Sequence, residues 1–127
     1  MVYKEVWHTF GKTQEAKILP FLREHFGREI QTQEDRFSKH DFYDDQFNYE
    51  LKSRHVKSTT YRDTLIATNK IQGEKELILV FNFRDCLAYI LYDKERFDGY
   101  TQQYINGDHK LHYMVPVEHL EIIKNWE

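Results

Sequence analysis

Residues 47–54, FNYELKSR, place a carboxylate and an ammonium two positions apart in a strand-like pattern. Apolar and polar side chains alternate along this stretch, which is typical of a β-strand with one buried face. Because successive side chains of a strand point to opposite faces, Glu50 and Lys52 share the polar face. The pair could be a surface salt bridge, worth at most about 1 kcal/mol. It could also belong to a site that does chemistry, and its neighbours decide between the two.

A second carboxylate, Asp41, precedes this strand in the strand-like stretch KHDFYDD. A two-residue turn at positions 44–45 would place Asp41 opposite Asn48, and one at 45–46 would place it opposite Glu50. Both put Asp41 on the polar face. A three-residue turn would move it to the other face. Two of the three hairpins therefore bring Asp41 to the Glu50 and Lys52 pair.

Two carboxylates that converge with a backbone carbonyl make an oxygen-rich site for a hard divalent ion such as Mg²⁺, for which Mn²⁺ can substitute. Here Asp41 and Glu50 would provide the carboxylates and Leu51 the carbonyl. Such an ion polarises a phosphodiester and lowers the pKa of a bound water. Lys52 would stabilise the developing charge or orient that water. Glu15, on the inner stripe of a preceding helix, is expected as an outer ligand.

That helix is expected over 13–26, because Thr13 is a good N-cap and Gly27 a good residue to follow the C-terminus. An apolar stripe at helical spacing supports it. Pro20 lies inside, so a kink or a restart of the helix is expected there. Glu15 lies on the apolar stripe in the first turn, which is an unusual position for a carboxylate.

The remaining chain shows no repeat or linker, so residues 1–127 are expected to form one domain. Its patterns first predict strands at Glu29–Asp35, Ser38–Tyr43 and Phe47–Arg54, followed by a helix that starts near Ser58–Thr60 and ends before Gly73. They then predict a central strand at 77–83 that is buried on both faces and a hairpin through Arg84-Asp85 into 86–93. The last elements expected are a polar loop at Asp98–Lys110, a strand at Leu111–Val115 and a short helix from Val117. This order indicates an α/β (α+β) fold with a mixed sheet flanked by helices.

Composition restricts the class of protein. The 127 residues are 40% hydrophobic and 16% aromatic, which favours a packed globule. No apolar run approaches the roughly 20 residues of a membrane span, and the N-terminus does not look like a signal peptide. A lone cysteine, Cys86, excludes an internal disulfide and fits a reducing compartment. We therefore expect a soluble, cytoplasmic or otherwise intracellular protein that does not bind membranes.

The segment KSRHVKSTTYR, from Lys52 to Arg62, is basic although the whole chain carries a net charge of −3. A solvated loop would explain a charge run alone. Its position beside paired carboxylates favours a role facing phosphate groups. The DNA-contacting residues expected in this segment are Arg54, His55, Lys57 and Arg62.

An inward helical glutamate, a strand aspartate, E-x-K nine residues later, a basic segment and a helix together resemble the PD-(D/E)XK nuclease superfamily. The similarity is greatest to archaeal Holliday junction resolvases and to small phage and viral nucleases. The matching stretches are GKTQEAKILPFLREHFG, KHDFYDD and FNYELKSR, and the resemblance covers roughly residues 11–92. One departure is that His40, and not proline, precedes Asp41.

The resemblance implies a restriction-endonuclease-like αβββαβ core. It also implies a magnesium-dependent DNA endonuclease, whose activity could be specific for DNA structure and resolve junctions. The catalytic positions carried over are Asp41, Glu50 and Lys52, with Glu15 and Lys70 supporting them. Resolvases act as symmetric dimers, so a homodimer is expected. It would act in the nucleoid or, if the protein is viral, in a host cell. The alternatives are a non-catalytic nucleic-acid- or protein-binding module on the same fold, and an unrelated interaction domain in which E-x-K is a surface ion pair.

Overall fold

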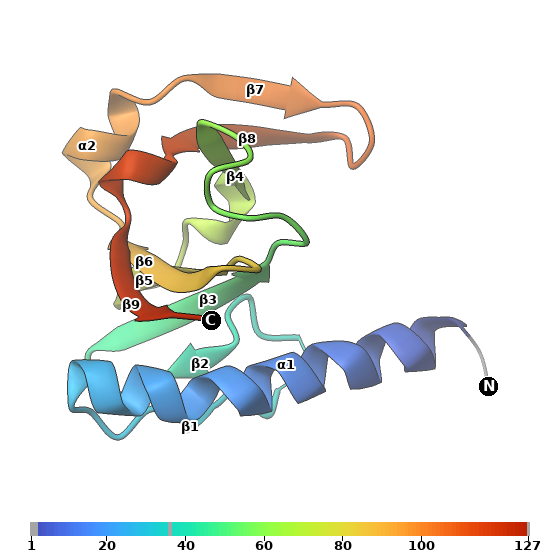
Figure 1. The fold of residues 1–127 in the computed structure, drawn as a ribbon, viewed down its shortest axis with the longest axis vertical. Helices are drawn as coiled ribbons and strands as arrows, with labels where there is room; N and C mark the ends of the chain where they lie inside the picture. The colour runs from blue at the N-terminus through green and yellow to red at the C-terminus, as the bar shows by residue number, and fades with distance from the viewer. Residues whose placement is uncertain (1–2, 36, 127) are drawn as a thin grey trace.

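The computed structural model describes residues 3–35 and 37–126, and these form three layers (Figure 1). The long helix α1 (Tyr3–Phe26) is one outer layer and a six-stranded sheet is the middle layer. A three-stranded sheet and the short helix α2 (Lys94–Asp98) cover the other side. The chain is therefore an α+β protein with a mixed central sheet, as predicted.

The strands are distributed over the two sheets as follows. The central sheet has the order β1 (Gln31–Thr32), β2 (Phe42–Tyr43), β3 (Phe47–Ser53), β5 (Glu76–Asn82), β6 (Cys86–Leu91) and β9 (Glu121–Asn125). In it β3 and β5 run parallel, and the other neighbouring strands are antiparallel. The antiparallel second sheet has the order β4 (Asp63–Ala67), β8 (Lys110–Pro116) and β7 (Gln102–Ile105). Two 3₁₀ turns, η1 (Thr68–Lys70) and η2 (Val117–His119), complete the described elements.

Helix α1 is longer than predicted. It begins at Tyr3, well before the expected start at Thr13, so Thr13 lies inside the helix and is not its N-cap. It ends at Phe26 as predicted, and Gly27 follows in the left-handed conformation with φ of 62°. Pro20 lies inside the continuous helix on its exposed side, so the helix does not restart there. No helix among the described residues is both long enough and apolar enough to cross a membrane.

Strand β5 occupies the centre of the molecule, as the apolar run predicted. Residues 77–81 are all buried, and alternate side chains contact different layers. Ile78 belongs to the same apolar cluster as Leu22 of α1, whereas Leu79 clusters with Val115 of β8. The predicted hairpin between β5 and β6 is also confirmed. The six-stranded sheet therefore has an apolar core on each face.

The helix predicted between Ser58 and Gly73 is wrong. The chain forms β4 and the turn η1 there, and β4 pairs with β8 along its whole length. Thr64 and Ile66 are β-branched and buried, which suits a strand that packs on the central sheet. The connection from β3 to the parallel β5 therefore runs through the second sheet and not through a helix.

Several other boundaries differ from the prediction. β1 and β2 have two residues each, so the strands expected at 29–35 and 38–43 are much shorter. β7 lies within the expected polar loop, and its residues are mostly exposed, so they carry no alternating pattern. α2 and β9 were not predicted, and the short helix expected from Val117 is a single 3₁₀ turn.

The β2–β3 turn is held by the carboxylate of Asp44, which is only 5% exposed. Its Oδ1 accepts hydrogen bonds from the backbone N–H groups of Gln46 (2.8 Å) and Phe47 (2.7 Å). Its Oδ2 accepts from the Tyr49 hydroxyl (2.5 Å) and from Arg28 Nε (2.7 Å). Burial alone would raise the pKa of Asp44, but these hydrogen bonds hold it well below its usual range.

The same turn fixes the register of the two strands. Phe42 pairs with Tyr49, so the turn consists of residues 45–46. This was one of the two turns predicted to place Asp41 on the polar face. Asp41 directly precedes Phe42, its N–H donates to the Tyr49 carbonyl, and its charge acts on the pKa of Glu50, so the hairpin brings the two carboxylates close together.

We expect Asp44→Asn to destabilise the fold by about 3 kcal/mol at pH 7, because it breaks a buried, charge-assisted set of hydrogen bonds. A carboxyl with a depressed folded pKa stabilises the fold above its unfolded pKa near 3.8 and stops doing so as the pH falls. The difference between variant and wild type should therefore shrink below about pH 4. Urea denaturation at neutral and acidic pH measures both effects.

The matched control is Asp45→Asn. The Asp45 side chain is 92% exposed and pairs with the same Arg28, so its loss should change stability little. Equal denaturation midpoints for Asp44→Asn and Asp45→Asn would contradict the role given to Asp44.

Candidate active site

Glu50 lies in the middle of β3 and is only 2% exposed. Its neighbour Tyr49 belongs to the apolar cluster beneath α1, so Glu50 projects from the opposite face of the sheet. There the connection from β4 to β5 passes close by, because a Cβ on Gly73 would lie 3.5 Å from Asn48 Nδ2. Glu50 is therefore a carboxylate held between the central sheet and the crossing chain.

Two ammonium groups lie close to this buried carboxylate. Lys52 Nζ is 3.8 Å and Lys70 Nζ is 3.5 Å from Glu50 Oε2. Lys52 comes from the same face of β3, and Lys70 is the last residue of η1. His40 Nε2 donates a hydrogen bond to the carbonyl oxygen of Lys70 (2.8 Å), which ties η1 to the residue before Asp41. Segments from three parts of the sequence thus meet at Glu50.

Asp41 is fixed against the backbone of β3. Its N–H donates to the carbonyl of Tyr49 (2.9 Å), and its Oδ2 accepts from the N–H of Leu51 (2.8 Å). The N–H and C=O of one strand residue point to the same side, so the Leu51 carbonyl also points toward the segment that carries Asp41. The two carboxylates and this carbonyl are the oxygen donors that were predicted to converge.

The electrostatics of the site follow from burial and crowding. Burial, reinforced by the negative charge of Asp41, raises the pKa of Glu50 to about 8, although Lys52 and Lys70 oppose the shift. Burial also lowers the pKa of Lys52, and the charges of Lys70 and Arg54 act in the same direction. Glu50 therefore gains or loses a proton near neutral pH, which is the range in which a catalytic or ligating carboxyl is useful.

The structure brings together four of the predicted site residues: Asp41, Glu50, Lys52 and Lys70. Glu15 is half-buried on α1, with its Oε2 shielded from solvent. α1 covers the sheet face opposite to the one from which Glu50 projects, and the predicted role of Glu15 as a ligand stays a prediction.

The donor set can be tested against the ion implied by the resemblance. Across residues 3–35 and 37–126, no group of three His, Cys, Asp or Glu side chains could hold a metal. The local donors are two carboxylates and a backbone carbonyl, all of them oxygen. Oxygen donors suit Mg²⁺, which keeps several waters and commonly uses one or two carboxylates. The residues present fit a sparsely ligated magnesium ion and do not fit a zinc site.

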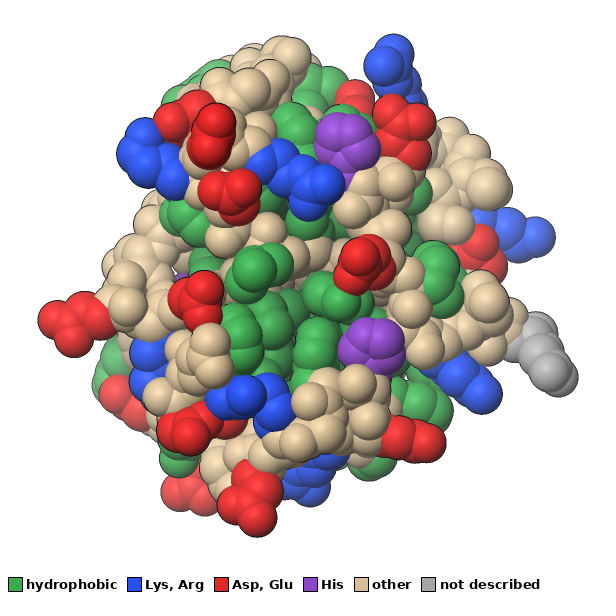
Figure 2. Space-filling model, turned by 90° about the vertical axis from the view of Figure 1, so that its left-hand side faces the viewer, with side chains coloured by type: hydrophobic (Ala, Val, Ile, Leu, Met, Phe, Trp, Pro, Cys, Tyr) green, Lys and Arg blue, Asp and Glu red, His purple; other side chains and the backbone are tan. Residues whose placement is uncertain are grey.

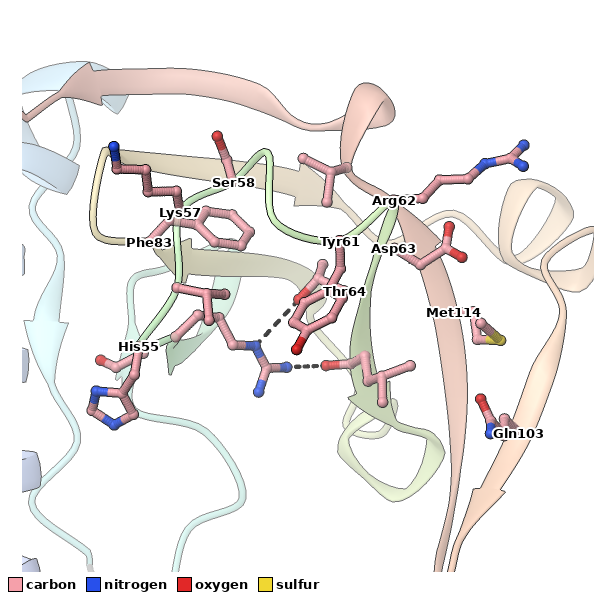
Figure 3. A pocket seen from close by; sticks show the side chains of 15 residues that line it. His55, Lys57, Ser58, Tyr61, Arg62, Asp63, Thr64, Phe83, Gln103 and Met114 are labelled. Carbon is pink, nitrogen blue, oxygen red and sulfur yellow. Dashed lines mark hydrogen bonds between the residues drawn. The ribbon is translucent and has the colours of Figure 1, made fainter.

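The four residues of the basic segment that were expected to contact DNA divide into one anchored and three exposed residues. Arg54 does not project freely into solvent: its Nε donates to Thr64 Oγ1 (3.2 Å) and its Nη2 to the Leu65 carbonyl, both on β4 (Figure 3). His55, Lys57 and Arg62 are exposed. Contact of these four residues with DNA stays a prediction, but Arg54 also has a structural role between β3 and β4.

Sequence reasoning did not identify the residues that support the site. Asp44, Tyr49 and Arg28 fix the hairpin, and His40 positions η1. An aspartate directly before a short turn was a signal for Asp44, since aspartate commonly binds the backbone of the turn that follows it. Nothing in the local sequence indicated the partners of Arg28 and His40, which lie far away along the chain.

Comparisons with protein-family models, with curated proteins and with solved structures find no match to this chain.

The raised pKa of Glu50 predicts how stability depends on pH. A carboxyl whose folded pKa exceeds its unfolded pKa binds its proton more tightly in the native state, so stability falls as the pH rises from about 4.5 to about 8. Glu50→Gln removes this titration. As the pH rises between these two values, the free energy of unfolding of the variant should increase by about 3 to 5 kcal/mol relative to that of wild type.

Melting temperatures of both proteins from pH 5 to pH 9 measure this difference. Glu76→Gln is the control, because Glu76 is exposed on the neighbouring strand β5. Parallel pH profiles for wild type and Glu50→Gln would show that Glu50 titrates normally.

Proposed function

We propose that this protein is a magnesium-dependent DNA endonuclease that hydrolyses phosphodiester bonds. The observation that carries the proposal is the approach of Asp41, just before β2, to Glu50 and Lys52 on one face of β3. Their approach depends on a specific hairpin register and on the burial of a carboxylate. An accidental surface ion pair would require neither.

The order of elements supports the proposal. Helix α1 is followed by β1, β2 and β3, and after a crossover by β5, which lies parallel to β3. This order agrees with an αβββαβ core as far as β3, but β4 and η1 stand where that core has its crossover helix. The replacement is a departure from the family pattern. Lys70, at the end of η1, would be the supporting lysine that related nucleases often carry, and its Nζ lies 3.5 Å from Glu50 Oε2.

Asp41, Glu50 and the Leu51 carbonyl would hold the ion, with Glu15 as an outer ligand and Mn²⁺ as a substitute. When bound, the ion polarises the phosphodiester and lowers the pKa of a water. Lys52 orients the attacking water or stabilises charge on the phosphate, and Lys70 supplies a second positive charge beside it. Glu50 keeps its proton near neutral pH without a cation and releases it when positive charge arrives, since its pKa is about 8.

A non-catalytic binding module is the second candidate, and one observation favours it. Lys52 and Lys70 lie 3.8 Å and 3.5 Å from Glu50 and offset part of the cost of its burial without a metal ion, and Glu50 is 2% exposed. In that case the cluster would be a structural link between β3 and η1. It would hold a nucleic-acid- or protein-binding surface in shape, and no substitution in it would affect catalysis.

A homodimer is the assembly that we propose, and one face is a candidate interface. Figure 2 looks onto the side of the molecule where α2 and the C-terminal end of α1 lie, and hydrophobic side chains reach the surface in its middle. A pocket of about 390 Å³ there is lined by Phe26, Phe47 and Leu91, among others. Leu91 is 40% exposed. A second copy would remove this apolar surface from water.

We expect Asp41→Asn and Glu50→Gln to abolish cleavage of DNA together with any rise in melting temperature caused by Mg²⁺, because each removes a ligand charge. Lys52→Ala should abolish cleavage but keep the magnesium-dependent rise, since an ammonium is not a ligand. All three should fold, because no apolar packing is lost.

Cleavage of plasmid, single-stranded and four-way-junction DNA with Mg²⁺, Mn²⁺ or chelator measures the activity. Asp45→Asn, a charge-neutralising change on the exposed side of the turn, is the control. Wild-type cleavage by Glu50→Gln would overturn the assignment and leave the binding module as the better candidate.

We also expect Lys57→Ala with Arg62→Ala to weaken DNA binding and to reduce its salt dependence, because fewer counterions are released. The slope of log K against log salt should flatten by about 1.4 to 1.8 for two lost phosphate contacts. The double variant Lys17→Ala with Lys124→Ala removes two exposed charges elsewhere and should leave more of the slope intact. Fluorescence anisotropy at several salt concentrations gives the slope for each double variant. Identical slopes for the two would show that this segment does not contact DNA.

A further inference from the structure

A pocket of about 610 Å³ opens beside the C-terminal end of β3, between the 54–62 loop and the second sheet (Figure 3). Its volume lies in the range of sites that hold small organic ligands. The apolar part of its lining consists of Val56, Leu65, Phe83, Met114 and Val117. None of the predicted catalytic residues lines it, so it is a feature separate from the Asp41 and Glu50 cluster.

The charged residues that line the pocket are mostly cations. Arg54, Lys57 and Arg62 are positive and Asp63 is the single acid, with His55 beside them. Figure 3 shows His55, Lys57 and Arg62 spread around the pocket with their polar ends turned outward. An apolar cavity surrounded by cations fits a ligand with an apolar or aromatic part joined to an anion.

Arg54 adds a more specific argument. It is half-buried, and both of its acceptors are neutral, namely the Thr64 hydroxyl and the Leu65 carbonyl. Its guanidinium lies 5.8 Å from the centre of the Phe81 ring. No carboxylate of the described residues forms an ion pair with it. A partly buried cation without a counter-charge favours the approach of an anion from the pocket side.

Tyr61 provides a surface for stacking. It lines the pocket, yet 67% of it is exposed. Figure 3 shows its ring lying within the pocket region and not folded away from it. A large aromatic ring left exposed beside a cationic rim is the arrangement with which proteins stack unpaired bases of single strands.

We infer that this pocket receives an unpaired nucleobase of the DNA strand, with Tyr61 stacking on the base and Arg54, Lys57 and Arg62 facing its phosphates. This rests on the proposed function and names its substrate class as DNA with unpaired bases near the cleavage point. Paired bases are stacked inside a duplex and cannot enter a pocket without being flipped out.

The position of the pocket along β3 agrees with this assignment. Glu50, Lys52 and Arg54 alternate onto one face of the strand, so Arg54 lies about 13 Å beyond Glu50. The Arg54 charge acts on the pKa of Lys52. A strand whose base occupies the pocket can therefore run toward the carboxylate cluster within a few nucleotides.

The test is binding of fluorescent DNA in the presence of a chelator, which separates the pocket from cleavage. The probes are a single-stranded oligonucleotide, the same strand with abasic sites scanned along it, and the perfect duplex. Wild type should bind the single strand more tightly than the duplex. Tyr61→Ala should weaken single-strand binding about 10-fold, the size expected for one stacked base.

Matched variants sharpen the result. Tyr61→Phe should bind like wild type, because it keeps the ring. Tyr104→Ala removes a tyrosine that is 53% exposed on β7 and does not line the pocket, so it should have no effect. An abasic site at one position of the strand should reduce the affinity of wild type by as much as Tyr61→Ala does. Combining that abasic strand with Tyr61→Ala should reduce the affinity no further.

Equal binding of single strand and duplex, or equal loss for Tyr61→Ala and Tyr104→Ala, would overturn the inference. A deoxynucleoside monophosphate that competes as well as the oligonucleotide would also overturn it, because the pocket would then be a free-nucleotide site. Binding in chelator does not depend on hydrolysis. If the protein does not cleave DNA, the stacking result therefore still tests the pocket. If Tyr61 does not stack on a base, the cleavage variants still test the nuclease proposal.

Discussion

The carboxylate of Asp44 decides which side chains face one another across β2 and β3. It accepts hydrogen bonds from two backbone N–H groups of the turn, from Tyr49 beneath α1 and from Arg28 beyond the helix end. These four donors come from separate parts of the structure, and they are satisfied together in one register. A shift by one residue would turn Asp41 to the α1 face and leave Glu50 without its acidic neighbour. The chemistry proposed on β3 therefore depends on a turn that takes no part in it.

The cluster around Glu50 costs the fold free energy of stabilisation. A carboxylate placed at the core of a sheet loses its hydration, and the nearby Asp41 makes ionisation less favourable still. The two lysines reduce this cost without removing it, because the pKa remains near 8. A fold that only needed a link between β3 and η1 could use apolar residues there at lower cost. A buried carboxyl with a raised pKa among other charged groups is more typical of a functional site than of a structural link.

Much of this site could be predicted from the sequence, because its central part is local. Alternation alone placed Glu50 and Lys52 on one face, and hairpin geometry limited Asp41 to a few positions. The choice among those positions depended in part on Arg28, which lies 16 residues from Asp44 in the sequence and which no local pattern connects to the turn. The β4 strand was mistaken for a helix because its pairing partner, β8, lies far along the chain. Arg54 was expected to contact DNA, and its additional tie to β4 was not predicted because it depends on the same distant pairing.

The central claim is that Asp41 and Glu50 hold a divalent cation, and carbon-13 NMR of the Glu50 carboxyl tests it most directly. At pH 7 without metal, the resonance should report a largely protonated group, since its pKa is about 8. Titration with Mg²⁺ should move it to the ionised position, and the Leu51 amide, which is bonded to Asp41, should shift at the same concentrations. A Glu50 carboxyl that stays protonated while Mg²⁺ reaches tens of millimolar would contradict the account.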